Sequence, residues 1–213
     1  VVMNPAALIT NLKDLLVGGM IIADQDAFTS RNLSRAGYTS NPLEDGSLDA
    51  YRLISIDITK QVIRSVEPFG LSHKFAVRCK NMWTLGLVMW LFDRDKQITI
   101  DNLNTKFALK QDIAKANIAA LNAGHSYAET AELPSGVEVY KIQKAEVEKG
   151  LYRNTTGSEA LAFGLIAGGQ LADISLTFAS YPITPASSLL HTLSAHKEFD
   201  VVTFQAEDEI AAA

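Results

Sequence analysis

Short apolar runs that alternate with helical patterns place the strongest constraint on how this chain can fold. An apolar strand end leads into Asn4, which can cap a helix that has Pro5 at its first position. Residues 20–24 (MIIAD) are typical of a buried parallel strand, and residues 51–59 (YRLISIDIT) alternate as a strand does. The polar stretch 25–50 between them is expected to be a loop. This order predicts a parallel α/β layer in the first part of the chain.

The middle of the chain has a helical pattern. Residues 72–92, 101–107 and 111–121 are predicted helices, and Ser72 is a plausible cap for the first of them. The expected apolar face of that first helix carries Phe75, Met82, Leu85 and Met89. The aromatic residues Trp83, Trp90 and Phe92 are expected in the core rather than on a binding platform.

A second α/β unit is predicted towards the end of the chain. Residues 155–169 have Thr or Ser at the start and a glutamate in the first turn, and their small side chains suggest a helix that packs closely on a neighbour. Two strands, 174–180 and 201–205, are separated by a short helix at 187–196, and AEDEIAAA then begins another helix. This alternation again predicts a parallel sheet.

The predicted domain boundary lies in a charged stretch. Residues 132–150 (ELPSGVEVYKIQKAEVEKG) are interrupted by turn residues, as linkers between domains are. We therefore expect one domain at residues 1–131 and another at residues 151–213. Both ends are expected to be cuts in a longer protein, because the sequence has no opening methionine and stops inside a helix just begun.

Composition excludes several classes of protein. Apolar residues make up 47% of the chain, which is enough for hydrophobic cores. The net charge of −5, without a basic stripe, argues against nucleic acid as the main partner. The longest apolar stretch, residues 84–92, is too short to span a membrane. The single cysteine, Cys79, excludes an internal disulfide framework, so a reducing, cytoplasmic compartment is expected.

A stiff turn follows the strand predicted at residues 174–180. In SYPITPASS, Pro182 and Pro185 fix φ and lack backbone N–H groups, which predicts a rigid, extended link through Ile183 and Thr184. The turn is either a rigid connection or a device that aims the Thr184 hydroxyl at a ligand. In open α/β sheets, ligands bind at the carboxyl ends of strands, where this turn is expected.

Three carboxylates follow the next strand. Asp208 and Glu209 are expected to form a charged first helical turn that complements the helix dipole. Glu207 follows the strand more directly and is the residue expected to lie deeper. Burial would raise the pKa of such a glutamate and let it share a proton with a heterocyclic nitrogen.

Other reactive side chains form weaker patterns. The histidines, at positions 73, 125, 191 and 196, do not have the spacing of metal ligands. Arg78 and Lys80 flank Cys79 and can depress the pKa of its thiol, although a cluster on a helix surface is the more ordinary interpretation.

Two motifs together resemble a known enzyme family. SYPITPASS, followed after the next strand by FQAEDEIAA, resembles the pyrimidine-binding domain of thiamine-diphosphate-dependent 2-oxoacid:ferredoxin oxidoreductases. Residues 78–94 and 113–132, with MNPAAL and GGMIIAD, resemble the γ-type domain of the fused α subunit in the 2-oxoglutarate branch. The resemblance implies an α/β fold in which a partial γ-type domain precedes the start of a pyrimidine-binding domain with a parallel sheet.

The resemblance also implies a cofactor site. The pyrimidine end of thiamine diphosphate would rest on residues 151–213, whereas Mg²⁺ at the diphosphate and a 4Fe–4S cluster would belong to a partner β subunit. Glu207 matches the glutamate that hydrogen-bonds N1′ of the aminopyrimidine and promotes formation of the nucleophile, with Glu209 as a close rival.

The stiff turn acquires a role from the same resemblance. Thr184 matches the threonine that faces the thiazolium side and an oxygen of the substrate, where a hydroxyl orients the 2-oxoacid. Tyr181, Pro182 and Ile183 would shape the wall of the cofactor pocket.

The implied reaction is the oxidative decarboxylation of 2-oxoglutarate with coenzyme A, which yields succinyl-CoA, CO₂ and reduced ferredoxin. The reaction is reversible, and in the reductive TCA cycle it proceeds in the direction of carboxylation. The chain would be active only with the rest of the α chain and a β subunit, in an (αβ)₂ assembly that reduces ferredoxin. The alternatives are the same chemistry on pyruvate or another 2-oxoacid, or a non-catalytic module for subunit assembly.

Overall fold

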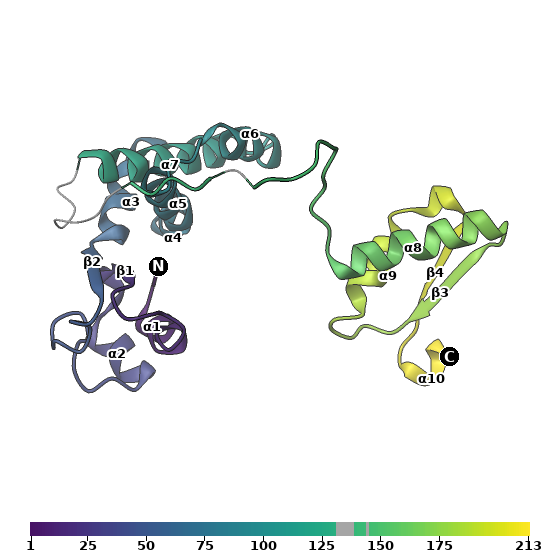
Figure 1. Cartoon of the computed structure of the whole chain (residues 1–213), viewed down its shortest axis with the longest axis horizontal. Coiled ribbons are helices and arrows are strands. Elements are labelled where there is room, and N and C mark those ends of the chain that lie inside the picture. The colour runs from purple at the N-terminus through teal and green to yellow at the C-terminus, as the bar shows by residue number, and fades with distance from the viewer. Residues whose placement is uncertain (131–138, 144) are drawn as a thin grey trace. The chain divides into compact units, whose positions relative to one another are not determined.

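The computed structural model describes residues 1–130, 139–143 and 145–213. The chain divides into two compact units, Val1–Ala145 (unit 1) and Glu146–Ala213 (unit 2), and each contains a small parallel sheet (Figure 1). Residues 132–138 and 144 of the expected linker lie outside the described residues. The boundaries expected from the sequence therefore stay a prediction, whereas the mixed α/β fold with parallel strands is confirmed.

Strand β1 of the unit 1 sheet is buried on both faces, whereas β2 is exposed at Arg52 and Ser55. Strands β1 (Met20–Asp24) and β2 (Arg52–Ile56) pair in parallel along their full lengths. Val2 forms an isolated parallel bridge with β1. Ile22 belongs to one hydrophobic cluster and Ile21 to another, because successive strand residues point to opposite faces. Burial on both faces is the usual state of a parallel sheet.

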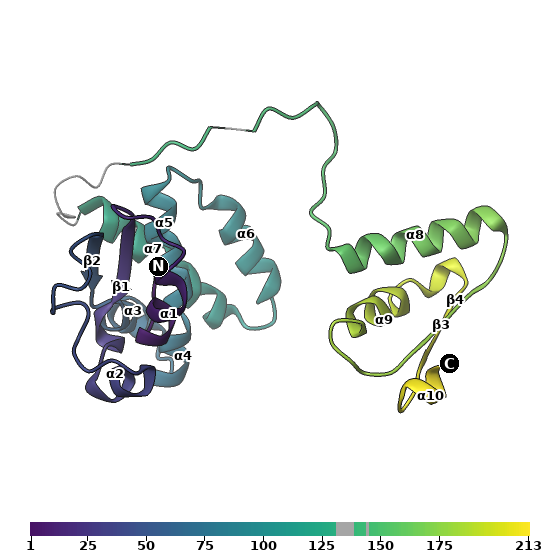
Figure 2. The ribbon, with the colours of Figure 1, turned by 60° about the horizontal axis from the view of Figure 1, so that its bottom comes forward.

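Helices build the rest of unit 1. In chain order they are α1 (Pro5–Leu12), α2 (Ser30–Ala36), α3 (Ile58–Val66), α4 (His73–Arg78), α5 (Lys80–Leu91), α6 (Gln97–Lys106) and α7 (Gln111–Thr130), with short 3₁₀ turns η1 (Gln25–Ala27) and η2 (Glu67–Phe69). Helices α5 and α7 lie side by side (Figures 1 and 2). The Trp83 side chain is buried between the helices, as the sequence predicts.

Two glycines allow α5 and α7 to approach at backbone distance. A Cβ atom added at Gly86 would lie 1.9 Å from the carbonyl oxygen of Leu121. One added at Gly124 would lie 1.8 Å from the carbonyl oxygen of Trp83. Any larger residue must therefore push the two helix backbones apart.

The substitution Gly124→Ala is expected to destabilise unit 1 by about 1–3 kcal/mol, since the added methyl group meets backbone that cannot rotate away. Urea unfolding followed by tryptophan fluorescence measures this, because the 2 tryptophans of the chain both lie in α5. Asn122→Ala, at an exposed position of the same helix, is the control and should shift stability by less than about 0.5 kcal/mol. Equal unfolding midpoints for the two variants would contradict the close approach.

Several boundaries in unit 1 differ from those expected. The stretch 25–50 is not only loop, because it contains α2, capped by Thr29 and ended by Gly37 at φ 85°. The strand expected at 51–59 stops at Ile56, where the start of α3 takes over. The first helix, which begins at Pro5 as expected, ends at Leu12.

The helix expected at residues 72–92 is broken at Cys79 into α4 and α5. The break changes which side chains face the core, and Phe75 is 43% exposed. The buried face of α5 is formed by Trp83, Leu87 and Leu91 instead of the predicted face. The predicted Met82, Leu85 and Met89 lie within α5 but are only half-buried, because the stripe that faces the core runs through Trp83 instead.

Unit 2 follows the predicted order of elements. It contains α8 (Gly157–Ala172), β3 (Leu176–Ser180), α9 (Ser187–Ser194), the 3₁₀ turn η3 (Lys197–Phe199), β4 (Val201–Gln205) and α10 (Glu209–Ala212). Helices α8 and α9 pack on each other and contact the strands through Ala162, Ile166 and Leu193. Thr156 and Glu159 form the capping box that begins α8.

The small residues of α8 do not produce close packing within the described chain. Added Cβ atoms at Gly157, Gly164 and Gly168 would meet no atom within 4 Å, so these positions face open space. The expectation of a tight helix contact along this stripe is wrong here, because α8 packs through its other side.

Among the described helices, none is long and apolar enough to cross a membrane.

Candidate functional site

The two sequence motifs lie next to each other at one edge of the unit 2 sheet. In the parallel β3–β4 pair, Ser180 is opposite Gln205, so both strands end at the same level. The backbone N–H of Ala206 donates to the carbonyl oxygen of Ser180 at 2.8 Å, which ties the two strand ends together. The YPITP turn and the AEDE string therefore leave the same sheet edge from neighbouring points.

The stiff turn is anchored to the start of α9. The carbonyl oxygen of Ile183 accepts hydrogen bonds from the backbone N–H and the hydroxyl of Ser187, each at 2.9 Å. The Thr184–Pro185 peptide is cis. Thr184 is exposed, and Ile183 is 43% exposed, so the turn presents a hydroxyl and an apolar side chain to solvent.

Tyr181 and Pro182 precede Ile183 and Thr184 in the turn. Tyr181 is half-buried and Pro182 is exposed. With Ile183, they form a short apolar surface that starts directly at the end of β3. Such a surface can contact the face of a flat ring.

The three carboxylates of the second motif have different surroundings. Asp208 caps α10, since its Oδ1 accepts the backbone N–H of Ala211 at 2.8 Å. Glu207 and Glu209 are exposed, and neither forms a hydrogen bond or ion pair with the described residues. The depth expected for Glu207 is therefore not observed, because Ala206 turns inwards at this point and leaves Glu207 outside.

This edge can bind a ring that carries a basic nitrogen. Its apolar residues can hold a planar group, and the Glu207 carboxyl can exchange a proton with a ring nitrogen. Asp208 is less suited to this task because the helix cap already uses its oxygen. Glu207 and Glu209 stay the two candidates.

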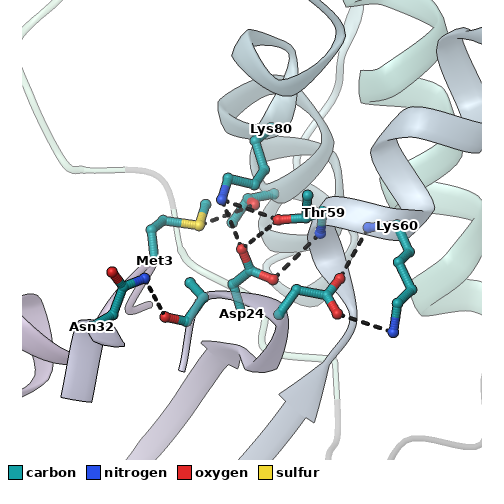
Figure 3. A network of polar contacts seen from close by, with 9 residues as sticks. Met3, Asp24, Asn32, Thr59, Lys60 and Lys80 are labelled. Carbon is teal, nitrogen blue, oxygen red and sulfur yellow. Dashed lines mark hydrogen bonds and ion pairs between the residues drawn. The ribbon is translucent and has the colours of Figure 1, made fainter. Parts of the chain in front are cut away.

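A second polar cluster closes the carboxyl edge of the unit 1 sheet. Asp24, the last residue of β1, is fully buried, and Lys80 Nζ lies 2.7 Å from its Oδ2. Thr59 donates its hydroxyl to the same Oδ2 at 2.9 Å and its backbone N–H to Oδ1 at 3.3 Å. Figure 3 shows Lys80 and Thr59 converging on Asp24 from two different helices.

The same edge satisfies the start of α3. Its first N–H groups lack partners within the helix. Asp24 accepts from Thr59, and Oδ2 of Asp26 accepts from the Lys60 N–H at 3.0 Å. Both carboxylates also lie near the positive end of the helix dipole. Since every oxygen of Asp24 is used within the protein, this cluster fastens β1 to α3 and α5 and does not present a free ligand site.

Cys79 is not an activated thiol. Its side chain is only 2% exposed, and burial raises the pKa of the thiol. Lys80 is turned towards Asp24 in the ion pair, so the idea of a surface cluster around Cys79 is also wrong. Within the described parts of the chain, no three His, Cys, Asp or Glu side chains are grouped to hold a metal ion.

Comparison with known proteins establishes the family. The family model described as pyruvate ferredoxin/flavodoxin oxidoreductase matches residues 1–127, more than half of the chain. The chain belongs to this family. Family membership agrees with the resemblance found in the sequence motifs.

Two curated relatives lie in the family. The chain is 48% identical over 210 residues to the 2-oxoglutarate oxidoreductase subunit KorA of Mycobacterium tuberculosis, which covers 99% of this chain and 32% of that protein. It is 27% identical over 172 residues to the 2-oxoacid:ferredoxin oxidoreductase 1 subunit alpha of Aeropyrum pernix, over 76% of this chain and 25% of that protein. The chain thus spans about a third or less of the curated relatives that it matches.

A solved member of the family has the same fold. The 2-oxoglutarate:ferredoxin oxidoreductase from Magnetococcus marinus, solved with 2-oxoglutarate, coenzyme A and succinyl-CoA bound, superposes with a TM-score of 0.70. The match covers 99% of this chain and 32% of that chain, at 22% sequence identity. At this level of identity the likeness establishes the fold.

Proposed function

We propose that this chain is part of a thiamine-diphosphate-dependent enzyme that converts 2-oxoglutarate and coenzyme A to succinyl-CoA and CO₂ while reducing ferredoxin. The observation that carries the proposal is the adjacency of the YPITP turn and the AEDE string at the carboxyl edge of the β3–β4 sheet. The names of the M. tuberculosis and M. marinus relatives support 2-oxoglutarate as the substrate.

The residues at this edge fit the aminopyrimidine end of thiamine diphosphate. They combine an exposed apolar surface with two free carboxylates, Glu207 and Glu209, and a flat ring with a basic nitrogen requires such a surface and one such carboxylate. When bound, thiamine diphosphate supplies the carbon nucleophile that attacks the 2-oxo group. The resemblance of the two motifs to the family leads us to assign Mg²⁺ at the diphosphate and the 4Fe–4S cluster to a partner β subunit.

Glu207 is proposed to hold a proton at the pyrimidine nitrogen. Its carboxyl is not engaged by the described residues, so it can rotate towards a ring placed against the turn. A partner subunit that covers this edge would exclude water from the carboxyl, which favours proton sharing with the ring nitrogen.

Thr184 is proposed to orient the 2-oxoacid. The substitution Thr184→Ala is expected to lower kcat/KM for 2-oxoglutarate about 10- to 100-fold, since a positioned hydroxyl that meets developing charge is lost. Steady-state kinetics of the assembled enzyme measure this, with Thr184→Ser as the control that retains the hydroxyl. Unchanged kinetics in the alanine variant would remove Thr184 from the site.

The first unit is proposed to be the γ-type domain of a fused α subunit, with residues 1–131 as its extent and residues 132–150 as the linker to the pyrimidine-binding domain. The word subunit in both curated relatives' names supports a partner chain. Ferredoxin in the names of the A. pernix relative and the M. marinus structure supports the electron acceptor. We propose a β subunit and an (αβ)₂ assembly.

The reaction is tested by expressing the full-length chain with its β partner. Reduction of a low-potential viologen is then measured with coenzyme A and either 2-oxoglutarate or pyruvate. We expect strong preference for 2-oxoglutarate and no reduction without coenzyme A. Preference for pyruvate would overturn the proposed substrate, and inactivity with every 2-oxoacid despite bound cofactor and cluster would overturn the proposed chemistry.

A further inference from the structure

A cavity of about 300 Å³ opens in unit 1 between α4 and the connection from α6 to α7. Apolar side chains and two cations line it, principally Leu71, Phe75, Phe107, Ile113, Arg78 and Lys110. We call it the amphipathic cavity. Its size and mostly apolar lining are those of a site for a small molecule.

The apolar part of this cavity is open to a ligand. Phe75 is 43% exposed, and Phe107 and Ile113 are half-buried, so a ligand would remove their remaining surface from water. Cys79, which is buried, also lines the cavity. An adjoining hollow of about 490 Å³ shares Phe75, Lys110 and Ile113 with it. That hollow extends to Leu109, which is 99% exposed, and its lining includes the carboxylate of Asp112.

The charged part of the cavity has one sign. Arg78 and Lys110 are exposed, and among the described residues neither forms an ion pair. The described lining contains no carboxylate, although the chain as a whole has a net charge of −5. Arg78 lies over the Phe75 ring, with its guanidinium carbon 5.3 Å from the ring centroid, so the positive charge is held beside the apolar wall.

These features select the ligand. An arginine fork binds a carboxylate through two parallel hydrogen bonds, and a nearby lysine adds a second positive charge. The neighbouring apolar surface favours a ligand whose carboxylate is attached to a hydrocarbon chain or ring. An uncharged ligand would form no ion pair with Arg78 or Lys110. A purely polar anion would leave the rings of Phe75 and Phe107 exposed to water.

We propose that the amphipathic cavity binds a small monocarboxylate with an apolar body, such as a medium-chain fatty acid. The cavity is built from unit 1 alone and shares no residue with the edge of unit 2 to which catalysis is assigned. The inference goes beyond the proposed function, and its test measures binding, which does not depend on turnover.

Octanoate is the probe, titrated calorimetrically into the assembled enzyme made of the full-length chain and its β partner. We expect saturable binding of one octanoate per chain, and binding of octanamide, which has the same body without the charge, at least 10-fold weaker. Equal binding of the two probes would overturn the proposed recognition of a carboxylate. Absence of saturable octanoate binding to the assembled enzyme would overturn the proposal.

The double variant Arg78→Gln/Lys110→Gln locates the binding. Both side chains are exposed, so the variant should keep the wild-type unfolding temperature and lose at least 10-fold in octanoate affinity. Lys115→Gln, at an exposed cation of α7 that does not line the cavity, is the matched control and should bind as the wild type does. Octanoate affinity that is unchanged in the double variant would place the ligand elsewhere and overturn the proposal.

Discussion

Replacement of Lys80 by methionine is expected to destabilise unit 1 by about 3–5 kcal/mol, because it leaves the carboxylate of Asp24 buried without its cation. Asp24 is fully buried, and Lys80 Nζ also lies 3.2 Å from the hydroxyl of Thr59. The loss is measured as a shift in the urea midpoint of tryptophan fluorescence, which reports on unit 1.

The neighbouring ion pair between Lys60 and Asp26 is a matched control. Their charged atoms are 3.1 Å apart, but the Lys60 side chain is 62% exposed. Water screens this pair, so Lys60→Met should cost no more than about 1 kcal/mol. The double variant Asp24→Leu/Lys80→Met should be more stable than Lys80→Met, since it removes the unpaired charge as well. A Lys80→Met midpoint equal to that of Lys60→Met would contradict the buried network.

The substitution Glu207→Gln is expected to lower kcat of the assembled enzyme about 100- to 10,000-fold. Glutamine can still accept and donate hydrogen bonds, but it cannot exchange the proton that the pyrimidine nitrogen requires. Glu207 is exposed in this chain, so the variant should fold and assemble as the wild type does. Viologen reduction with 2-oxoglutarate and coenzyme A gives the rate.

Glu209→Gln distinguishes the two carboxylates. Both residues are exposed, and they differ mainly in their distance along the chain from the end of β4. We expect Glu209→Gln to retain most of the activity. If Glu209→Gln is inactive and Glu207→Gln is active, the proton-holding role belongs to Glu209.

One strand and two helix caps were predicted closely, because each depends on neighbouring residues. The predicted strand 201–205 coincides with β4, and Asn4 and Thr156 cap helices through their own side chains. The parallel pairing of β3 and β4 followed from the helix between them. That pairing was sufficient to bring the YPITP turn beside the AEDE string.

What the sequence did not reveal depends on contacts between distant residues. Asp24 and Lys80 are 56 positions apart, and the only local signal was a charged residue at the end of an apolar strand. The helix α2 was missed within a polar stretch, although Thr29 and Gly37 were signals for its start and end. The exposure of Glu207 could not be read from its place after a strand, because a shift of one residue decides which side chain turns inwards, and here it is Ala206.

Hydrogen–deuterium exchange of the assembled enzyme, with and without thiamine diphosphate and Mg²⁺, tests most directly whether the two motifs form one cofactor site. Peptides that contain the turn at residues 181–186 and the string at residues 206–210 should exchange more slowly when the cofactor is bound. Peptides from α6 should be unaffected. Protection of both motifs together is the predicted result. Cofactor binding that leaves both motifs unprotected would contradict the account.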